Sequence, residues 1–267
     1  MKKLMLSLLI YLSLSGVTNA KQEYEMSYKE QSNSASLIIN QVLKVGAKGE
    51  YLFGREFVID FDSSSAKENG DLSFTINKAK ANWLGHGSKF RQQSSHIIGK
   101  TFSLKHSPDD EYILSPLDKD FAIEIQLVDS GFPVGRAVSE LLPILPKVKI
   151  AKGSKWSSLK KIHSLEGWSW LESEATSEHE VTSIEKTNGS VLVHVETLTK
   201  GKLKDSKQGR KYIGDGELSR TSSWVFNVTK GHLVSIVSEQ NTDGQSDSPH
   251  ALQNVKQSTS FKLSFGL

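Results

Sequence analysis

Apolar and polar residues alternate one by one along many separate segments of this chain, and this pattern limits its fold most. Residues 72–76 read LSFTI, and the same period of two recurs over 191–195, 224–228 and 261–267. Side chains of a β-strand point alternately to the two faces of a sheet, so the period is typical of strands with one buried face. The chain is therefore predicted to be mainly β.

Turn residues between these segments predict antiparallel neighbours. Asn188-Gly189 precedes the pattern at 191–195, and Thr229-Lys230-Gly231 lies inside a predicted hairpin over 221–239. More strands are expected near residues 37–45, 53–61, 101–105 and 176–185. Loops rich in polar residues and glycine are expected at 63–70, 200–216 and 241–250.

Helix signals are confined to the middle of the chain. Pro133 suits the first turn of a helix, and Pro143 would end it. The residues that then share one helical face are Val134, Ala137, Val138, Leu141 and Leu142. A second helix is expected after Ser115-Pro116, over 117–128, although the alternation of 121–127 fits a strand equally well.

The order of these patterns predicts one β-rich domain over residues 21–267. Strand patterns fill about 21–115 and 147–267, with the helical centre between them, and the two halves share a loose similarity that leaves an internal duplication open. A sheet with one apolar face and a helix with one apolar stripe can cover each other. We therefore expect a β-rich α+β fold, in which a long curved antiparallel sheet or half-barrel wraps around the helix at 133–142.

The first twenty residues predict export. Lys2 and Lys3 precede an apolar run over 4–14, and small residues follow up to Ala20. This is the pattern of a secretory signal peptide cut after Ala20, and no later segment is apolar enough for a transmembrane helix. We expect a bacterial protein secreted across the inner membrane, in the periplasm or associated with the outer membrane.

The small net charge and the absence of known motifs exclude several classes of function. The chain has 33 Lys and Arg, 30 Asp and Glu and no cysteine, so neither a nucleic-acid partner nor thiol chemistry is expected. The eight histidines lack the spacing of a metal site, and no serine lies in a G-x-S-x-G turn. We therefore expect no metal, no cofactor and no identifiable catalytic residue, with a hydrolase of unrecognised site kept as an alternative.

Apolar and aromatic side chains indicate the candidate binding site. A half-open sheet around a helix often leaves an apolar cleft, and such clefts are the usual sites for small molecules. The predicted lining is Val134, Val138, Leu141, Leu142, Trp156, Trp170, Trp224 and Phe226. The expected function is non-enzymatic binding of an apolar or lipid-like ligand, or scaffolding with another envelope protein. The competing interpretation is that these side chains simply close the core.

The C-terminal strand pattern keeps one further alternative open. Phe261, Leu263, Phe265 and Leu267 alternate with polar or small residues, as they do in the last strand of outer-membrane β-barrels. The many charged residues of the other predicted strands would be costly on a lipid-facing surface. A small outer-membrane β-barrel is therefore the second choice.

Three segments of the mature chain form a set of motifs. They are the stretch 99–111, then Val148, Gly153 and Trp156, then Trp224, Phe226, Gly231 and Leu233. The set resembles the G-K-x-F-x-L-x-x-S-P-x-G-E, V-x-x-G-x-x-W and W-x-F-x-x-x-x-G-x-L segments of an uncharacterised family of secreted bacterial proteins and lipoproteins. The spacing after Val148 differs, and Asp110 stands where glycine is usual. The resemblance implies a β-rich envelope protein and carries no activity.

Overall fold

The structure is a computed structural model that describes most of the chain. The described residues are 22–29, 32–45, 51–65, 71–85, 88–93, 95–107, 111–114, 122–125, 128–166, 169–204, 216–248 and 251–266. The predicted signal peptide with its cleavage site after Ala20, and Trp168, lie outside them.

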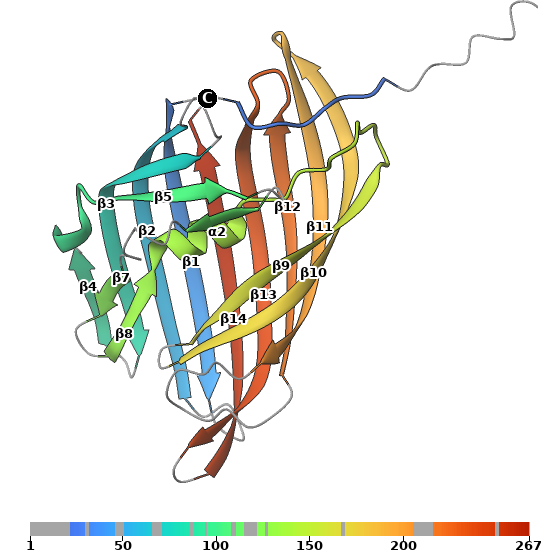
Figure 1. Ribbon diagram of the computed structural model, residues 1–267. Coiled ribbons are helices and arrows are strands. Elements are labelled where there is room, and N and C mark those ends of the chain that lie inside the picture. The colour runs from blue at the N-terminus through green and yellow to red at the C-terminus, as the bar shows by residue number, and fades with distance from the viewer. Residues whose placement is uncertain are drawn as a thin grey trace, which may run out of the picture.

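The described residues form a long antiparallel sheet that curves into a trough (Figure 1). Eleven of its twelve strands follow the order β6-β5-β3-β2-β1-β14-β13-β12-β11-β10-β9, and β4 pairs with β3. The bounds in the first half of the chain are β1 (Ser32–Val45), β2 (Tyr51–Ser65), β3 (Leu72–Gly85), β4 (Ser88–Gln93), η1 (Ser95–Ile97), β5 (Thr101–His106) and β6 (Tyr112–Leu114). Those in the second half are β9 (Lys155–Glu166), β10 (Ser169–Thr187), β11 (Ser190–Lys204), β12 (Gly216–Asn227), β13 (His232–Ser248) and β14 (Ala251–Phe265).

Between the two halves lie a small hairpin and a helix. Strands β7 (Ala122–Ile125) and β8 (Val128–Pro133) pair with each other, and α2 (Val134–Leu141) follows at once. In Figure 1, α2 lies on the concave side of the trough, in front of the central strands. The prediction of a mainly β fold, with a curved antiparallel sheet around a short helix, is confirmed.

The sheet has its first and last strands at its centre. Strand β1 pairs with β14, from Ala35 opposite Phe265 to Val45 opposite Val255. Each half of the chain therefore builds its own side of the sheet, and the outermost strands of the order are β6 and β9. Because the middle of the chain joins these two edges, the connection that carries α2 crosses the concave side (Figure 1).

The hydrophobic core lies between the concave face and α2. In β12, buried and exposed residues alternate strictly from Gly216 to Trp224, as the sequence pattern predicts. Rings of Phe74 and Phe102 stack with centroids 5.2 Å apart, and Phe61 meets both edge-on. Burial of such rings supplies much of the stabilisation of a fold that has no disulfide.

The segment 22–29 lies across one end of the trough. Tyr24 forms an isolated bridge with Ile150, and the amide of Lys29 donates to the carbonyl of Gly231 at 2.8 Å. The ring of Tyr28 meets those of Tyr112 and Phe226 edge-on, at 5.0 and 5.4 Å. Burial raises the pKa of Tyr28 well above its ordinary value. This end of the concave side is thus closed by aromatic side chains.

Several predicted elements are confirmed and two are wrong. The helix near 133–142, the hairpin over 221–239 and the strands near 37–45, 53–61, 101–105 and 176–185 are all present. The second predicted helix is wrong where the structure describes it, because β7 and β8 occupy 122–125 and 128–133. Its alternating apolar residues followed the strand period. The predicted loop at 241–250 is also wrong, because β13 continues to Ser248 and pairs with β14.

Candidate functional site

Most of the residues predicted to line a cleft lie together in the packed core. Val134, Val138, Leu141, Leu142, Trp224 and Phe226 are each at most 3% exposed. Trp156 is half-buried on β9, and Trp170 lies on β10, its side chain outside the described structure. The helix residues, Trp224 and Phe226 thus belong to one buried cluster, and no open cleft is seen between them among the described residues. Their contact with a ligand stays a prediction.

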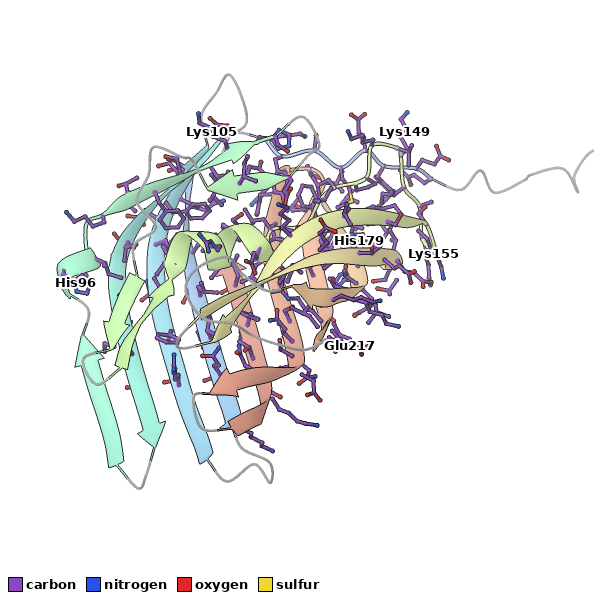
Figure 2. All side chains as sticks on the ribbon, turned by 60° about the horizontal axis from the view of Figure 1, so that its bottom comes forward. His96, Lys105, Lys149, Lys155, His179 and Glu217 are labelled. Carbon is purple, nitrogen blue, oxygen red and sulfur yellow. The ribbon has the colours of Figure 1, made fainter. Side chains whose placement is uncertain are left out.

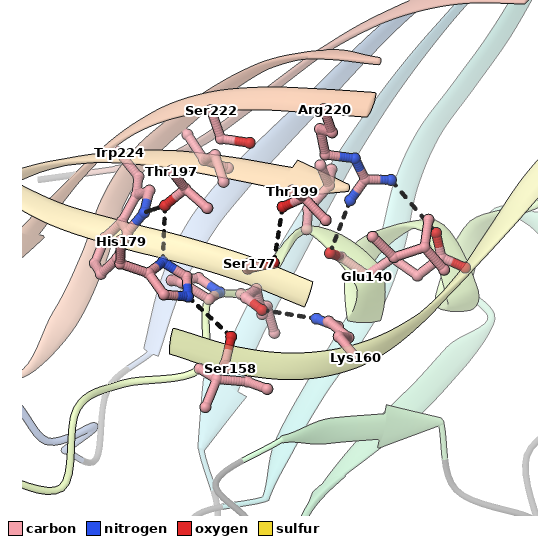
Figure 3. A pocket seen from close by; sticks show the side chains of 16 residues that line it. Glu140, Ser158, Lys160, Ser177, His179, Thr197, Thr199, Arg220, Ser222 and Trp224 are labelled. Atoms are coloured by element: carbon pink, nitrogen blue, oxygen red, sulfur yellow. Dashed lines mark hydrogen bonds and ion pairs between the residues drawn. The ribbon is translucent and has the colours of Figure 1, made fainter. Parts of the chain in front are cut away.

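A cavity of about 30 Å³ lies where α2 ends against strands β9–β13 (Figure 3). Its walls are apolar at Leu141, Leu142 and Trp224, and charged at Lys160 and Arg220. A space of this size holds about two water molecules. The cavity cannot hold a lipid chain as it stands, but it leaves unfilled space where the end of the helix meets the sheet.

Lys160 points inward from the edge strand β9 and binds the C-terminal end of α2. Its Nζ donates to the carbonyl oxygens of Ser139 at 2.7 Å and Leu142 at 2.9 Å. The last carbonyls of a helix lack partners inside the helix and carry the negative end of its dipole. Burial lowers the pKa of Lys160 to about 8, against the opposing effect of Glu111 and Glu140. At neutral pH a buried ammonium therefore holds this helix end.

Arg220 on β12 binds the same helix end from the other side. Its Nη1 donates to the carbonyl oxygen of Glu140 at 3.2 Å, and its Nη2 lies 3.6 Å from the Glu140 carboxylate. Nε and Nη2 also donate to Oε1 of Gln240, and the guanidinium lies 5.3 Å from the ring centre of Phe261. Burial lowers the pKa of Arg220, and Glu140 opposes this. Two strand-borne cations therefore secure one end of α2.

A hydrogen-bonded chain runs beside the cavity from Trp224 to Ser158. Trp224 Nε1 is 2.9 Å from Thr197 Oγ1, Thr197 Oγ1 is 2.8 Å from His179 Nδ1, and His179 Nε2 is 2.9 Å from Ser158 Oγ. The indole donates to the Thr197 oxygen, which has a second lone pair as well as its own hydrogen. Thr197 can therefore donate to Nδ1 of His179 or accept from it, and the direction of the Ser158 bond is set by the same His179 tautomer.

The charge state of His179 limits what it can do chemically. Burial, together with the nearby charge of Lys160, lowers the pKa of His179 to about 4, so its ring is neutral at physiological pH. Both ring nitrogens are in hydrogen bonds, to Thr197 and to Ser158, and the ring stacks on Trp156 with centroids 4.7 Å apart. His179 is therefore held in one orientation by three neighbours.

The strand register places a row of polar side chains across eight strands of the concave face. We call it the polar row. Its members, paired in register from β9 to β2, are Ser158, Ser177, Thr199, Arg220, Gln240, Thr259, Gln41 and Arg55. The six from Ser177 to Gln41 are at most 6% exposed, so the row is a buried feature and not part of the solvated surface.

A parallel row of apolar side chains lies four residues away along the strands. We call it the apolar row, and its members are Val181, Val195, Trp224, Ile236, Leu263, Leu37 and Ile59. All are at most 4% exposed. Four residues of a strand span about 14 Å, so the concave face changes from apolar to polar within that distance.

Two buried oxygens just beyond the polar row are unsatisfied. Thr242 and Gln257 face each other on β13 and β14, and each is 2% exposed. Thr242 Oγ1 and Gln257 Oε1 have no hydrogen-bond partner among the described residues. A buried polar atom without a partner costs about 1–3 kcal/mol, so this position is suited to a polar group from outside the described chain.

A wider groove of about 710 Å³ adjoins the cavity along the edge strand β9. Ile144, Ser158 and Lys160 line both spaces. The groove also holds the most exposed large apolar side chains of the described surface, Leu159 at 68% and Val148 at 67%. Only a few side chains therefore separate the interior cavity from an apolar surface groove.

The functional residues that the sequence interpretation missed are Lys160, His179 and Arg220. Arg220 shares its strand face with Trp224 and Phe226. A charged residue among positions that the alternation places in the core could therefore have been recognised from the sequence. Lys160 stands in the same relation to Ile162 on β9. No three His, Asp or Glu side chains of the described residues come together as a metal site would require. Nor is any described helix long and apolar enough to span a membrane.

Comparison with known proteins gives a likeness of fold. No family model and no curated protein matches the chain. A solved structure described as "Lipid-protein interactions in lipovitellin" is similar over 91% of this chain, with a TM-score of 0.51 and 11% sequence identity. The match covers 26% of the lipovitellin chain, so this protein corresponds to about a quarter of that length. At this identity the likeness concerns the fold alone, an open antiparallel sheet.

Proposed function

We propose that this protein binds a lipid-like amphiphile on the concave side of its sheet, with the hydrocarbon chain on the apolar row beneath α2. The observation that carries the proposal is a short helix that packs with the apolar part of the concave face of an open sheet. The similarity in fold to lipovitellin, whose structure is described in terms of lipid–protein interactions, supports it. The predicted signal peptide would bring the protein to the bacterial envelope, where such ligands are abundant.

Room for the ligand comes from displacement of α2, because the present cavity is of water size. Burial of a sixteen-carbon chain supplies about 12 kcal/mol, at about 0.8 kcal/mol for each methylene. The three large side chains of α2 that would lose their burial, Val134, Val138 and Leu141, supply about 1.5–3 kcal/mol each. Burial of an acyl chain can therefore offset the side-chain burial that the helix would lose on leaving the sheet.

The helix is suited to leaving its place. It has eight residues, too few for a helix that is stable on its own, so it depends on its packing. Its C-terminal end is secured by hydrogen bonds and an ion pair to Lys160 and Arg220, which other polar groups can replace. The groove beside β9 gives a ligand an apolar surface next to this end.

Titration with a neutral fluorescent probe, N-phenyl-1-naphthylamine, tests the proposal. We expect saturable uptake by the folded protein with one site per chain. Ile236→Trp, on the sheet surface at the apolar row, should block uptake while circular dichroism shows an intact fold, because the larger ring occupies the place of the hydrocarbon chain even when α2 has moved. Val237→Trp on β13, at a position 46% exposed, is the matched control and should leave uptake unchanged.

The opposite result would show that the side chains only close the core. In that case the wild type takes up no probe saturably, and Ile236→Trp merely destabilises the fold by the ~1–3 kcal/mol typical of overpacking.

A further inference from the structure

We infer that the polar row is the headgroup subsite for this ligand, and that Arg220 with Lys160 selects an amphiphile whose head is an anion. The inference rests on the proposed function and deepens it, since it names the chemical class of the ligand. The observation that carries it is the position of the groups that balance the charge of these two buried cations.

The described carbonyl and carboxylate partners of both cations come mainly from the end of α2, whereas Gln240 on β13 is a neutral partner of Arg220. Among the described residues, the carboxylate paired with Arg220 is Glu140, whose side chain is 8% exposed and belongs to the helix. Lys160 donates to two helix carbonyls, with Glu111 as a second acidic neighbour outside the helix. When α2 moves, Glu140 and those carbonyls move with it. Two cations then stay on β9 and β12, and Glu111 is the acidic neighbour of Lys160 that remains among the described residues.

A buried cation without a partner is strongly unfavourable, so the displaced state needs a replacement anion. A neutral head offers none. A carboxylate or phosphate can accept two parallel hydrogen bonds from the planar guanidinium of Arg220, while Lys160 supplies a point charge beside it. The anion therefore exchanges with the Glu140 carboxylate rather than adding to it, and the charge of the site is balanced in both states.

The rest of the polar row completes a headgroup site. Ser158, Ser177 and Thr199 bring hydroxyl groups to the cavity wall beside Arg220. The unsatisfied oxygens of Thr242 and Gln257 lie two residues beyond the row along their strands and can accept from a hydroxyl of a larger head. The apolar row lies about 14 Å away along the strands. An amphiphile with its head on Arg220 thus places its chain along the apolar half of the face.

Paired binding measurements with oleate and oleyl alcohol test the inference, because these probes share one chain and differ in the charge of the head. We expect the wild type to prefer oleate by about tenfold or more at pH 7. Arg220→Gln and Lys160→Met should each reduce this ratio to about threefold or less, mainly by weakening oleate. Lys155→Met is the matched control, because this lysine is 69% exposed at the periphery of the molecule (Figure 2), and it should keep the ratio.

Glu140→Gln tests the exchange from the other side. It removes the carboxylate that competes with the ligand, so the affinities for oleate and for oleyl alcohol should both rise, by about threefold or more. This variant and Lys160→Met keep the test decisive if Arg220→Gln fails to fold.

The outcomes separate the two proposals. Equal affinity of the wild type for both probes overturns the anion site and leaves the lipid-binding proposal standing. An unchanged ratio in the folded Lys160 and Arg220 variants, or an unchanged oleate affinity in Glu140→Gln, also overturns the anion site. Binding of neither probe overturns the proposed function itself.

Discussion

Replacing Lys160 by methionine exchanges a buried ammonium for an apolar side chain of similar length, and it should remove a rise of stability at alkaline pH. The pKa of Lys160 is about 8 in the folded protein, whereas the ordinary value is 10.5. Between these values the unfolded chain holds a proton that the folded chain has lost. Stability rises with pH wherever the unfolded state binds more protons, so the wild type gains stability across this window.

The magnitude follows from the two pKa values. One pKa unit corresponds to about 1.4 kcal/mol, and the gain of the wild type between pH 7 and pH 10 is about 2.5 kcal/mol. At pH 7 the methionine variant leaves the carbonyls of Ser139 and Leu142 without this donor, at about 1–3 kcal/mol each, but avoids a charge-burial cost of about 3 kcal/mol. The two proteins should therefore have similar free energies of unfolding at pH 7, and the variant should be clearly weaker at pH 10.

Urea unfolding followed by tryptophan fluorescence measures this difference at both pH values. Other groups titrate between pH 7 and 10, but they do so in both proteins and cancel in the comparison. Lys155→Met, which removes a largely exposed lysine, should show no such change. A difference between wild type and Lys160→Met that shifts by less than about 0.5 kcal/mol from pH 7 to pH 10, or that shifts in favour of the variant, would refute the reasoning.

Three further perturbations have defined outcomes. The pKa of His179 is about 4 in the folded protein, so on acidification the unfolded chain takes up this proton at a higher pH than the folded chain does. Lowering the pH from 7.5 to 4.5 should therefore cost the wild type about 2.5 kcal/mol of stability, a loss that His179→Asn should not show. Equal acid sensitivity of the two proteins would contradict this. Phe102→Ala should lower the free energy of unfolding by about 3–5 kcal/mol in urea titrations, and a loss below about 1 kcal/mol would count against the core described above. In Gly231→Ala, at a φ of +70°, the new Cβ would overlap the Lys29 side chain, whereas in Gly189→Ala, at +76°, it meets open space. Gly231→Ala should therefore lower the free energy of unfolding more than Gly189→Ala does, and should speed tryptic cleavage at Lys29. Equal losses in the two variants would be the contrary result.

The elements of the fold could be predicted from the sequence where a local pattern decides them. Pro133, the apolar spacing after it and Pro143 define α2, and the Thr229-Lys230-Gly231 turn defines the hairpin of β12 and β13. Residues 241–248 could not be predicted in this way. They have the composition of a loop, and only their pairing with β14 makes them a strand, so a non-local interaction overrides the local preference.

The candidate site was less accessible to prediction for a geometric reason. Alternation tells which face of a strand a residue occupies, but it does not give the register between strands. Arg220 lies beside Gln240 and Thr199 because three strands pair at a particular offset, and each offset depends on turns and bulges. The apolar cluster of α2 with Trp224 could therefore be foreseen, while the polar row appeared only with the pairing of eight strands.

The meeting of β1 and β14 at the centre of the sheet sets the order in which the molecule can be completed. Strand β1 is synthesised before all other strands of the sheet, and the edge that it offers to β14 stays open until β14 itself has been made. Each half can form beforehand from neighbouring hairpins. The pairing of β1 with β14 then closes a loop that spans nearly the whole chain, and contacts between residues so far apart in sequence form slowly. Until then β1 exposes an unpaired edge that another chain can pair with. A chain interrupted before β14 would thus be left as a half-sheet prone to association with its own kind.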